Sequence, residues 1–177
     1  AHYKMICNES PVPVILYNVP GRTGCNMTAE TTLNLAHDFD NIVGVKEASG
    51  NMEQIMSIIK DKPEGFVVIS GDDGITMPLI ACGAEGVISV VANAFPKDFS
   101  EMVRMSMKGN FDKARELHYR FSEIIPLLFA EGSPGGIKAV LNMKDICEDH
   151  LRLPLVNISK SHLNKLSAAI DKIHETA

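Results

Sequence analysis

The sequence contains no tryptophan, few aromatic residues (6%) and only four cysteines among its 177 residues. The cysteines lie far apart, none belongs to a CxxC pair, and the chain is too large to need a disulfide framework. We therefore expect reduced thiols and a cytoplasmic protein. No uninterrupted apolar run approaches the roughly 18 residues of a membrane-spanning helix, and the opening AHYKMICNES does not have the basic-then-apolar pattern of a secretion signal.

The charged residues are balanced and dispersed. The chain has 17 basic and 22 acidic residues, a net charge of −5 and no run of five like charges, which makes nucleic acid and anionic membranes poor candidate partners. The six histidines show no metal-ligand spacing, so we expect no metal site. With 45% hydrophobic and 22% charged residues, the composition is that of an ordinary globular domain.

Four short apolar runs rich in valine and isoleucine recur along the first half of the chain. Such runs are typical of buried parallel strands. Helical patterns lie between them, so the predicted order is β-α-β-α-β-α-β. The predicted strands are VPVILYN (12–18), NIVGVKEA (41–48), GFVVISG (65–71) and GVISVVAN (86–93).

Each predicted strand ends in polar residues or glycine that apolar packing would not select. Four parallel strands with crossover helices fit either a doubly wound sheet or part of a (β/α)₈ barrel. The strand ends favour the barrel, where such groups converge at one face and build active sites. A barrel needs eight strands, so we predict an α/β fold made of half a barrel. The end groups are Tyr17-Asn18, Lys46-Glu47, Ser70-Gly71-Asp72-Asp73 and Ala92-Asn93.

After the fourth strand the sequence predicts helices only. One long helix is predicted over residues 112–131, with a kink at Pro126. We therefore divide the chain into residues 1–96, which hold the four strands, and residues 97–177, which form the final barrel helix and a C-terminal helical region. Other helices are expected to begin at Pro96, near Pro134 and near Ser159.

Lys46 is the residue that points most directly to chemistry, because an ammonium at the end of an apolar strand is costly unless it has a use. Strand alternation places Lys46 on one face and Glu47 on the other, where we expect a structural role. Lys46 either caps strand-end carbonyls or acts as a nucleophile that forms a Schiff base. The nucleophile is the neutral amine, and an ordinary lysine titrates near 10.4, so burial or a nearby cation must favour that form.

Tyr17 and Arg22 are the next candidates. Strand order makes Tyr17 a neighbour of Lys46 at about 4.8 Å, where its phenol either relays protons during imine formation or satisfies a loop carbonyl. The turn-rich stretch from residue 18 to residue 24 holds Arg22, whose guanidinium suits a carboxylate. The alternative for Arg22 is a cation on a mobile surface loop.

The stretches YNVPGRTG, VGVKEASGN, SGDDG and GVISVVAN, with LFAEGSPGGIKAVL and LRLP downstream, are similar to signature stretches of the dihydrodipicolinate synthase family, within the N-acetylneuraminate lyase superfamily. The resemblance covers nearly the whole chain and implies the C-terminal half of a TIM barrel. It implies that Lys46 is the Schiff-base lysine and Tyr17 the proton relay. It further implies that Arg22 binds the carboxylate of the aldehyde substrate, and that Gly71 and Ile88 contribute backbone groups.

The reaction that the resemblance implies is the condensation of pyruvate with L-aspartate 4-semialdehyde to 4-hydroxy-tetrahydrodipicolinate, a lyase step of diaminopimelate and lysine biosynthesis. It implies no metal or organic cofactor, a covalent pyruvate imine on Lys46, and a homo-oligomer, dimer or tetramer. The family's threonine pair and second tyrosine are expected outside these 177 residues, which alone should be inactive. The alternatives are a related 2-oxo-acid lyase, which Arg22 disfavours, and a non-catalytic half-barrel that acts as a binding module.

Overall fold

The protein is described here by a computed structural model, which describes residues 1–175. The chain divides into two compact units, Ala1–Ile88 and Ser89–Ala177. The division lies earlier than the predicted boundary after residue 96. Within the described part of the chain, no helix is both long and apolar enough to cross a membrane.

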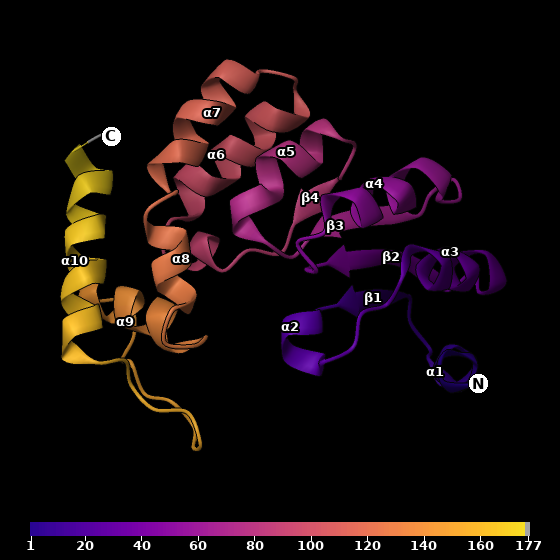
Figure 1. Ribbon diagram of the computed structural model, residues 1–177, viewed down its shortest axis with the longest axis horizontal. Helices are drawn as coiled ribbons and strands as arrows, with labels where there is room; N and C mark the ends of the chain where they lie inside the picture. The colour runs from indigo at the N-terminus through magenta and orange to yellow at the C-terminus, as the bar shows by residue number, and fades with distance from the viewer. Residues whose placement is uncertain (176–177) are drawn as a thin grey trace. The chain divides into compact units, whose positions relative to one another are not determined.

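The first unit holds a parallel four-stranded sheet in the order β1-β2-β3-β4, with a helical connection between successive strands (Figure 1). This is the predicted β-α-β-α-β-α-β order. Its elements are α1 (His2–Glu9), β1 (Val14–Asn18), α2 (Pro20–Thr23), α3 (Ala29–Asp38), β2 (Ile42–Glu47), α4 (Met52–Asp61), β3 (Val67–Ser70), η1 (Asp73–Ile75), α5 (Thr76–Ala81) and β4 (Gly86–Val87).

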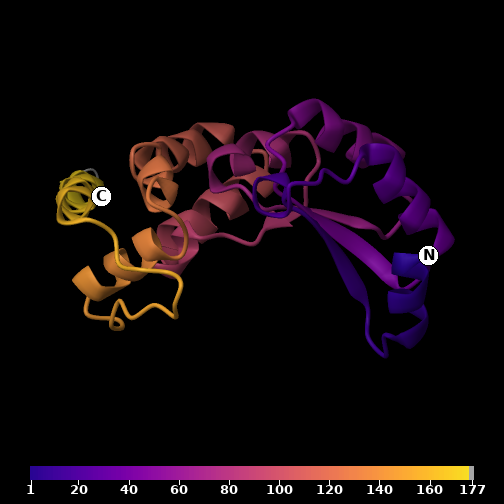
Figure 2. The ribbon, with the colours of Figure 1, turned by 60° about the horizontal axis from the view of Figure 1, so that its bottom comes forward.

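The sheet has one face that helices cover and one that they leave open (Figure 2). The covered face carries buried residues, whose apolar members pack with helical side chains such as Ile55 and Ile58. The open face carries partly or largely exposed residues. We call "covered face" the set Leu16, Asn18, Val45, Glu47, Val68 and Ser70, and "open face" the set Ile15, Tyr17, Lys46 and Ile69.

Two local features fix the geometry around β2. Asn51 caps α4 by accepting a hydrogen bond from the backbone N–H of Gln54 at 3.1 Å. Gly44 allows β3 to lie close, since a Cβ at this position would be 2.4 Å from Cγ2 of Val67. Replacing Gly44 by a larger residue would therefore move the neighbouring strand.

The prediction of a strand over residues 86–93 is wrong in length. The extended part ends at Val87, and Val91–Asn93 forms a 3₁₀ turn instead. The sequence runs on as apolar and β-branched, but side-chain bonds favour the turn. The hydroxyl of Ser89 accepts from the N–H of Ala92 at 2.9 Å, and the amide of Asn93 donates to the carbonyl of Val90 at 3.0 Å.

The second unit is helical in its described residues. The single helix predicted over residues 112–131 is in fact two, because the helix breaks over residues 121–123. Pro126 explains the break, since its ring clashes with the carbonyl four residues earlier. The elements are η2 (Val91–Asn93), α6 (Pro96–Met107), α7 (Phe111–Arg120), α8 (Ile124–Phe129), α9 (Gly135–Met143) and α10 (Lys160–Glu175).

The start of α10 is tied to the end of α8 by polar contacts. The carboxylate of Glu131 accepts from the backbone N–H and the hydroxyl of Ser159, both at 2.6 Å. These bonds hold the pKa of Glu131 below its ordinary value of 4.5. The buried ring of His162 bonds the carbonyl of Leu127 at 2.7 Å through Nε2.

Candidate active site

Lys46 and Tyr17 are brought together on the open face at the carboxyl ends of β1 and β2. They are register partners in the parallel pair, and Nζ of Lys46 lies 4.3 Å from the centroid of the Tyr17 ring. Tyr17 is 45% exposed, while Lys46 is half-buried. The ring face stabilises an ammonium, by about 0.5–1 kcal/mol at an exposed site. An amine held in this way is accessible to a small carbonyl compound and has a phenol beside it.

Gly71 leaves the space that the Lys46 side chain occupies. A Cβ on Gly71 would lie 3.0 Å from Cε of Lys46 and 2.7 Å from Cβ of Ala48. Gly71 also extends the strand edge, because its N–H donates to the carbonyl of Glu47 at 2.7 Å. The absence of a side chain at position 71 therefore sets where the Lys46 amine can lie.

Ile88 and Arg22 lie at the same edge of the sheet by their elements, but their side chains do not bond the pair. Ile88 is 50% exposed and donates its N–H to the carbonyl of Ser70 at 3.0 Å, just beyond β4. Arg22 is exposed on the short helix α2, which follows β1. Among the described residues, no hydrogen bond, ion pair or ring contact joins its guanidinium to Lys46 or Tyr17.

The covered face holds a polar cluster behind this pair that the sequence analysis did not identify. Glu47 is 1% exposed and points away from Lys46, as predicted. Its carboxylate accepts from the amides of Asn18 and Gln54. The sequence shows Asn18 only as a polar strand end, and nothing in it singles out Gln54. Gln54 stands at the third position after the Asn51 cap, where a glutamine often bonds backward to the cap, and that pattern would have pointed away from Glu47.

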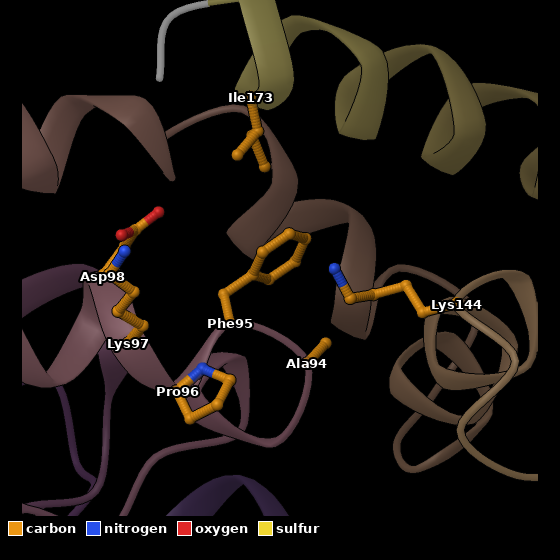
Figure 3. Close-up of a pocket in the computed structure, with 7 residues that line it drawn as sticks. All are labelled: Ala94, Phe95, Pro96, Lys97, Asp98, Lys144 and Ile173. Carbon is orange, nitrogen blue, oxygen red and sulfur yellow. The ribbon is translucent and has the colours of Figure 1, made fainter.

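The second unit contains a cavity of about 330 Å³, and none of the candidate site residues lines it (Figure 3). Nζ of Lys144 lies 4.6 Å from the centroid of the Phe95 ring, and Asp98 pairs with Arg120 at 3.5 Å. The lining mixes both charge signs and selects no ligand class. Among the side chains that the structure describes, there is also no group of three or more histidine, cysteine, aspartate or glutamate residues able to bind a metal ion. The cavity is lined by Ala94, Phe95, Pro96, Lys97, Asp98, Lys144 and Ile173.

The sequence matches the profile of the Dihydrodipicolinate synthetase family over residues 1–173. The chain is similar to the 4-hydroxy-tetrahydrodipicolinate synthase of Phocaeicola vulgatus, with 55% identity over 172 residues, which are 97% of this chain and 58% of the relative. It is also similar to the enzyme of the same name from Parabacteroides distasonis, with 59% identity over 155 residues, covering 88% of this chain and 52% of the relative. The chain thus spans little more than half the length of these relatives.

Solved structures of dihydrodipicolinate synthases match the fold of this chain. Dihydrodipicolinate synthase from Aquifex aeolicus matches with a TM-score of 0.94 and 39% identity, over 98% of this chain and 59% of that one. A protein described as the first monomeric dihydrodipicolinate synthase variant matches with a TM-score of 0.92 and 38% identity, over 97% of this chain and 58% of that one. The predicted fold, four βα units of a TIM barrel followed by helices, is confirmed.

Proposed function

This chain belongs to the dihydrodipicolinate synthetase family, and we propose that the natural protein that carries it is a Schiff-base-forming lyase. The reaction is the condensation of pyruvate with L-aspartate 4-semialdehyde to 4-hydroxy-tetrahydrodipicolinate, in diaminopimelate and lysine biosynthesis. One observation carries the proposal: the amine of Lys46 lies against the Tyr17 ring, at the carboxyl end of a parallel strand. That is the edge of a barrel where active sites lie.

The chemistry begins at Nζ of Lys46. After losing a proton, the amine attacks C2 of pyruvate, the carbonyl oxygen takes up protons, and water leaves to give an imine. Loss of a proton from C3 gives an enamine, whose C3 bonds to the aldehyde carbon while the aldehyde oxygen is protonated. The amino group of the semialdehyde then attacks the imine carbon, closes the ring and releases Lys46. One water leaves overall, and the protons balance without an oxidant or a reductant.

The other four candidate residues have distinct proposed roles. Tyr17 moves protons to and from the oxygen that leaves C2, because its phenol is exposed beside the amine. Arg22 binds the carboxylate of the aldehyde substrate with its fork of N–H donors, for which its exposed guanidinium is free among the described residues. Gly71 and Ile88 offer backbone groups at the strand edge.

The proposal includes no metal and no organic cofactor, since the covalent pyruvate imine performs the activation. It places the protein in the cytoplasm, which the reduced, unpaired state of its four cysteines supports. It also includes a homo-oligomer, dimer or tetramer. One solved relative is described as the first monomeric variant, so sedimentation of the natural protein is the measurement that fixes its own state.

The experiment that tests the function is a kinetic comparison of aldehydes with the natural full-length protein that carries this sequence. With pyruvate as the common partner, aspartate semialdehyde should give the highest kcat/KM, and Lys46→Ala should lower that value by at least about 1,000-fold. A higher kcat/KM with an aldehyde that lacks a carboxylate would indicate a related 2-oxo-acid lyase. Wild-type protein that consumes neither pyruvate nor aldehyde would support the non-catalytic binding module instead.

A further inference from the structure

Glu47 is a buried carboxylate whose hydrogen-bond partners among the described residues are all neutral. No lysine, arginine or histidine of the described residues bonds it. Its partners are neutral: the Asn18 amide at 3.0 and 3.1 Å to the two oxygens, the Gln54 amide at 2.9 Å, and the N–H of Ser49 at 2.9 Å. Every contact is a donor to the carboxylate, as an ionised group requires. Burial of such a group is costly even when it is hydrogen-bonded, so stability alone does not explain it.

Backbone groups of Met27 fix the direction of both amides. Oδ1 of Asn18 accepts from the N–H of Met27 at 2.9 Å, which leaves Nδ2 to face Glu47. Nε2 of Gln54 donates to the carbonyl of Met27 at 3.2 Å, which leaves no other orientation for that amide. Hydrogen bonds to the main chain therefore determine the orientation of both amides, and in that orientation their N–H groups face the Glu47 carboxylate.

The cluster lies directly behind Lys46 and Tyr17. Asn18 and Glu47 are register partners one residue beyond the Tyr17–Lys46 pair, on the opposite face of the same two strands. A backbone hydrogen bond also joins the ends of the two strands, since the N–H of Ala48 donates to the carbonyl of Asn18 at 2.8 Å. A bond that fixes Asn18 to Glu47 therefore fixes the spacing between Tyr17 and Lys46.

The same cluster reaches the segment that follows the helix of Arg22. Oδ1 of Asn26 accepts from the Asn18 amide at 2.9 Å, and its own amide donates to Oε1 of Gln54 at 2.8 Å. One carboxylate thus joins the ends of β1 and β2, the start of α4 and the loop at residues 24–27. These are the elements that carry or adjoin three of the five candidate site residues.

We propose that Glu47 is a positioning residue, whose buried carboxylate holds the ends of β1 and β2 in the one spacing that sets the Lys46 amine against Tyr17. The inference rests on the proposed function, because it assigns Lys46 the nucleophilic role. Glu47 itself touches no reacting atom, since it points to the covered face. Its effect is on the geometry from which the amine attacks, and a displacement of about 1 Å can cost about 100-fold in rate.

The test is Glu47→Gln in the natural full-length protein, which replaces one acceptor oxygen by a donor that faces other donors. Glu53→Gln is the matched control, since it makes the same chemical change at an exposed position of α4. Pyruvate is added, the imine is trapped with borohydride at timed intervals, and the rate is expressed per site that is labelled after long incubation. Unfolded protein then does not lower the rate.

We expect Glu47→Gln to form the imine about 10- to 100-fold more slowly at saturating pyruvate, with Glu53→Gln unchanged. The double variant Glu47→Gln/Gln54→Glu restores a donor facing an acceptor between the two side chains and should recover part of the rate. If Glu47→Gln does not fold, Gln54→Ala takes its place. This variant keeps the carboxylate, removes the hydrogen bond from Gln54 and should slow imine formation about 3- to 10-fold.

The outcomes separate the two proposals. One outcome overturns the positioning role and leaves the function intact: the wild-type protein forms the adduct on Lys46, and Glu47→Gln forms it at an unchanged rate per site. Where Gln54→Ala replaces Glu47→Gln, an unchanged rate per site in Gln54→Ala has the same meaning. Failure of the double variant to recover any rate also overturns it, because a merely structural loss would not depend on the pairing of donor and acceptor. Absence of any wild-type adduct overturns the proposed function and the positioning role together.

Discussion

The two faces of the sheet differ in how far this chain completes them. On the covered face, Leu16, Val45 and Val68 are buried against helices, and the carboxylate of Glu47 has donors on both oxygens. On the open face, Ile15 is 46% exposed and Tyr17 is 45% exposed. The residues that carry the proposed chemistry lie on the face that is not packed.

The difference shows which properties are local to this chain. The covered face fixes the direction of Lys46, because β2 can place Glu47 in its amide cluster only by turning Lys46 to the other side. The open face supplies a nucleophile and a phenol, and its other two residues, Ile15 and Ile69, have apolar side chains that offer no hydrogen bond to the carboxylate of pyruvate. The chain spans 58% of a relative that is 55% identical to it. In a protein of that length, the remaining residues are numerous enough to form a segment that packs on the open face.

The largest effect is expected when the 177 residues are studied alone. They should show no synthase activity and should self-associate, because β1 and β4 are edges of the described sheet and apolar side chains are exposed on its open face. Light scattering and a coupled activity assay measure both properties. A compact, active monomer would show that the covered face alone suffices.

Arg22→Leu should reduce kcat/KM for aspartate semialdehyde in the natural full-length protein by about 10- to 150-fold, the cost of about 1.5–3 kcal/mol for a charge-assisted contact. Imine formation with pyruvate alone should be unchanged, because Arg22 has no contact with the Lys46 amine. Stopped-flow measurements of the two half-reactions separate these effects. Equal losses in both would identify Arg22 as a structural residue, and Arg22→Lys should keep part of the activity by keeping the charge.

Gly71→Ala tests how closely the strand edge fits the lysine. The added Cβ would lie 3.0 Å from Cε of Lys46 and 2.7 Å from Cβ of Ala48, so we expect about 10-fold slower imine formation and a loss of about 1–3 kcal/mol of stability. Gly21→Ala is the control, since nothing lies within 4 Å of a Cβ there. Thermal unfolding and timed borohydride trapping measure the two effects. Equal behaviour of the two variants would contradict the close fit.

The smallest effect concerns an exposed carboxylate, which contrasts with the buried Glu47. Hydrogen bonds from Ser159 lower the pKa of Glu131 in the folded protein, so the stability they provide is present above the ordinary value of 4.5 and is lost as the pH falls through the lowered value. The stability difference between wild type and Glu131→Gln should therefore be largest near neutral pH and vanish in acid. Denaturant unfolding at several pH values measures it, and a difference independent of pH would exclude this cause.

The sequence was sufficient for the order of the strands and for the opposite directions of Lys46 and Glu47, because both follow from local periodicity. It failed where packing or side-chain bonds override periodicity, as in the turn at Val91–Asn93 and the break before Pro126. The amide cluster was not predictable, since the bond from Gln54 to Glu47 depends on how α4 lies against the sheet. The roles of the candidate site residues stay predictions.

The role of Lys46 is tested by identifying the residue that carries the reduced pyruvate adduct. The natural full-length protein is incubated with pyruvate, treated with borohydride, digested and mapped by peptide mass spectrometry. We expect a single adduct on Lys46, absent without pyruvate and absent in Lys46→Ala. An adduct on any other lysine, or no adduct in active protein, would contradict it.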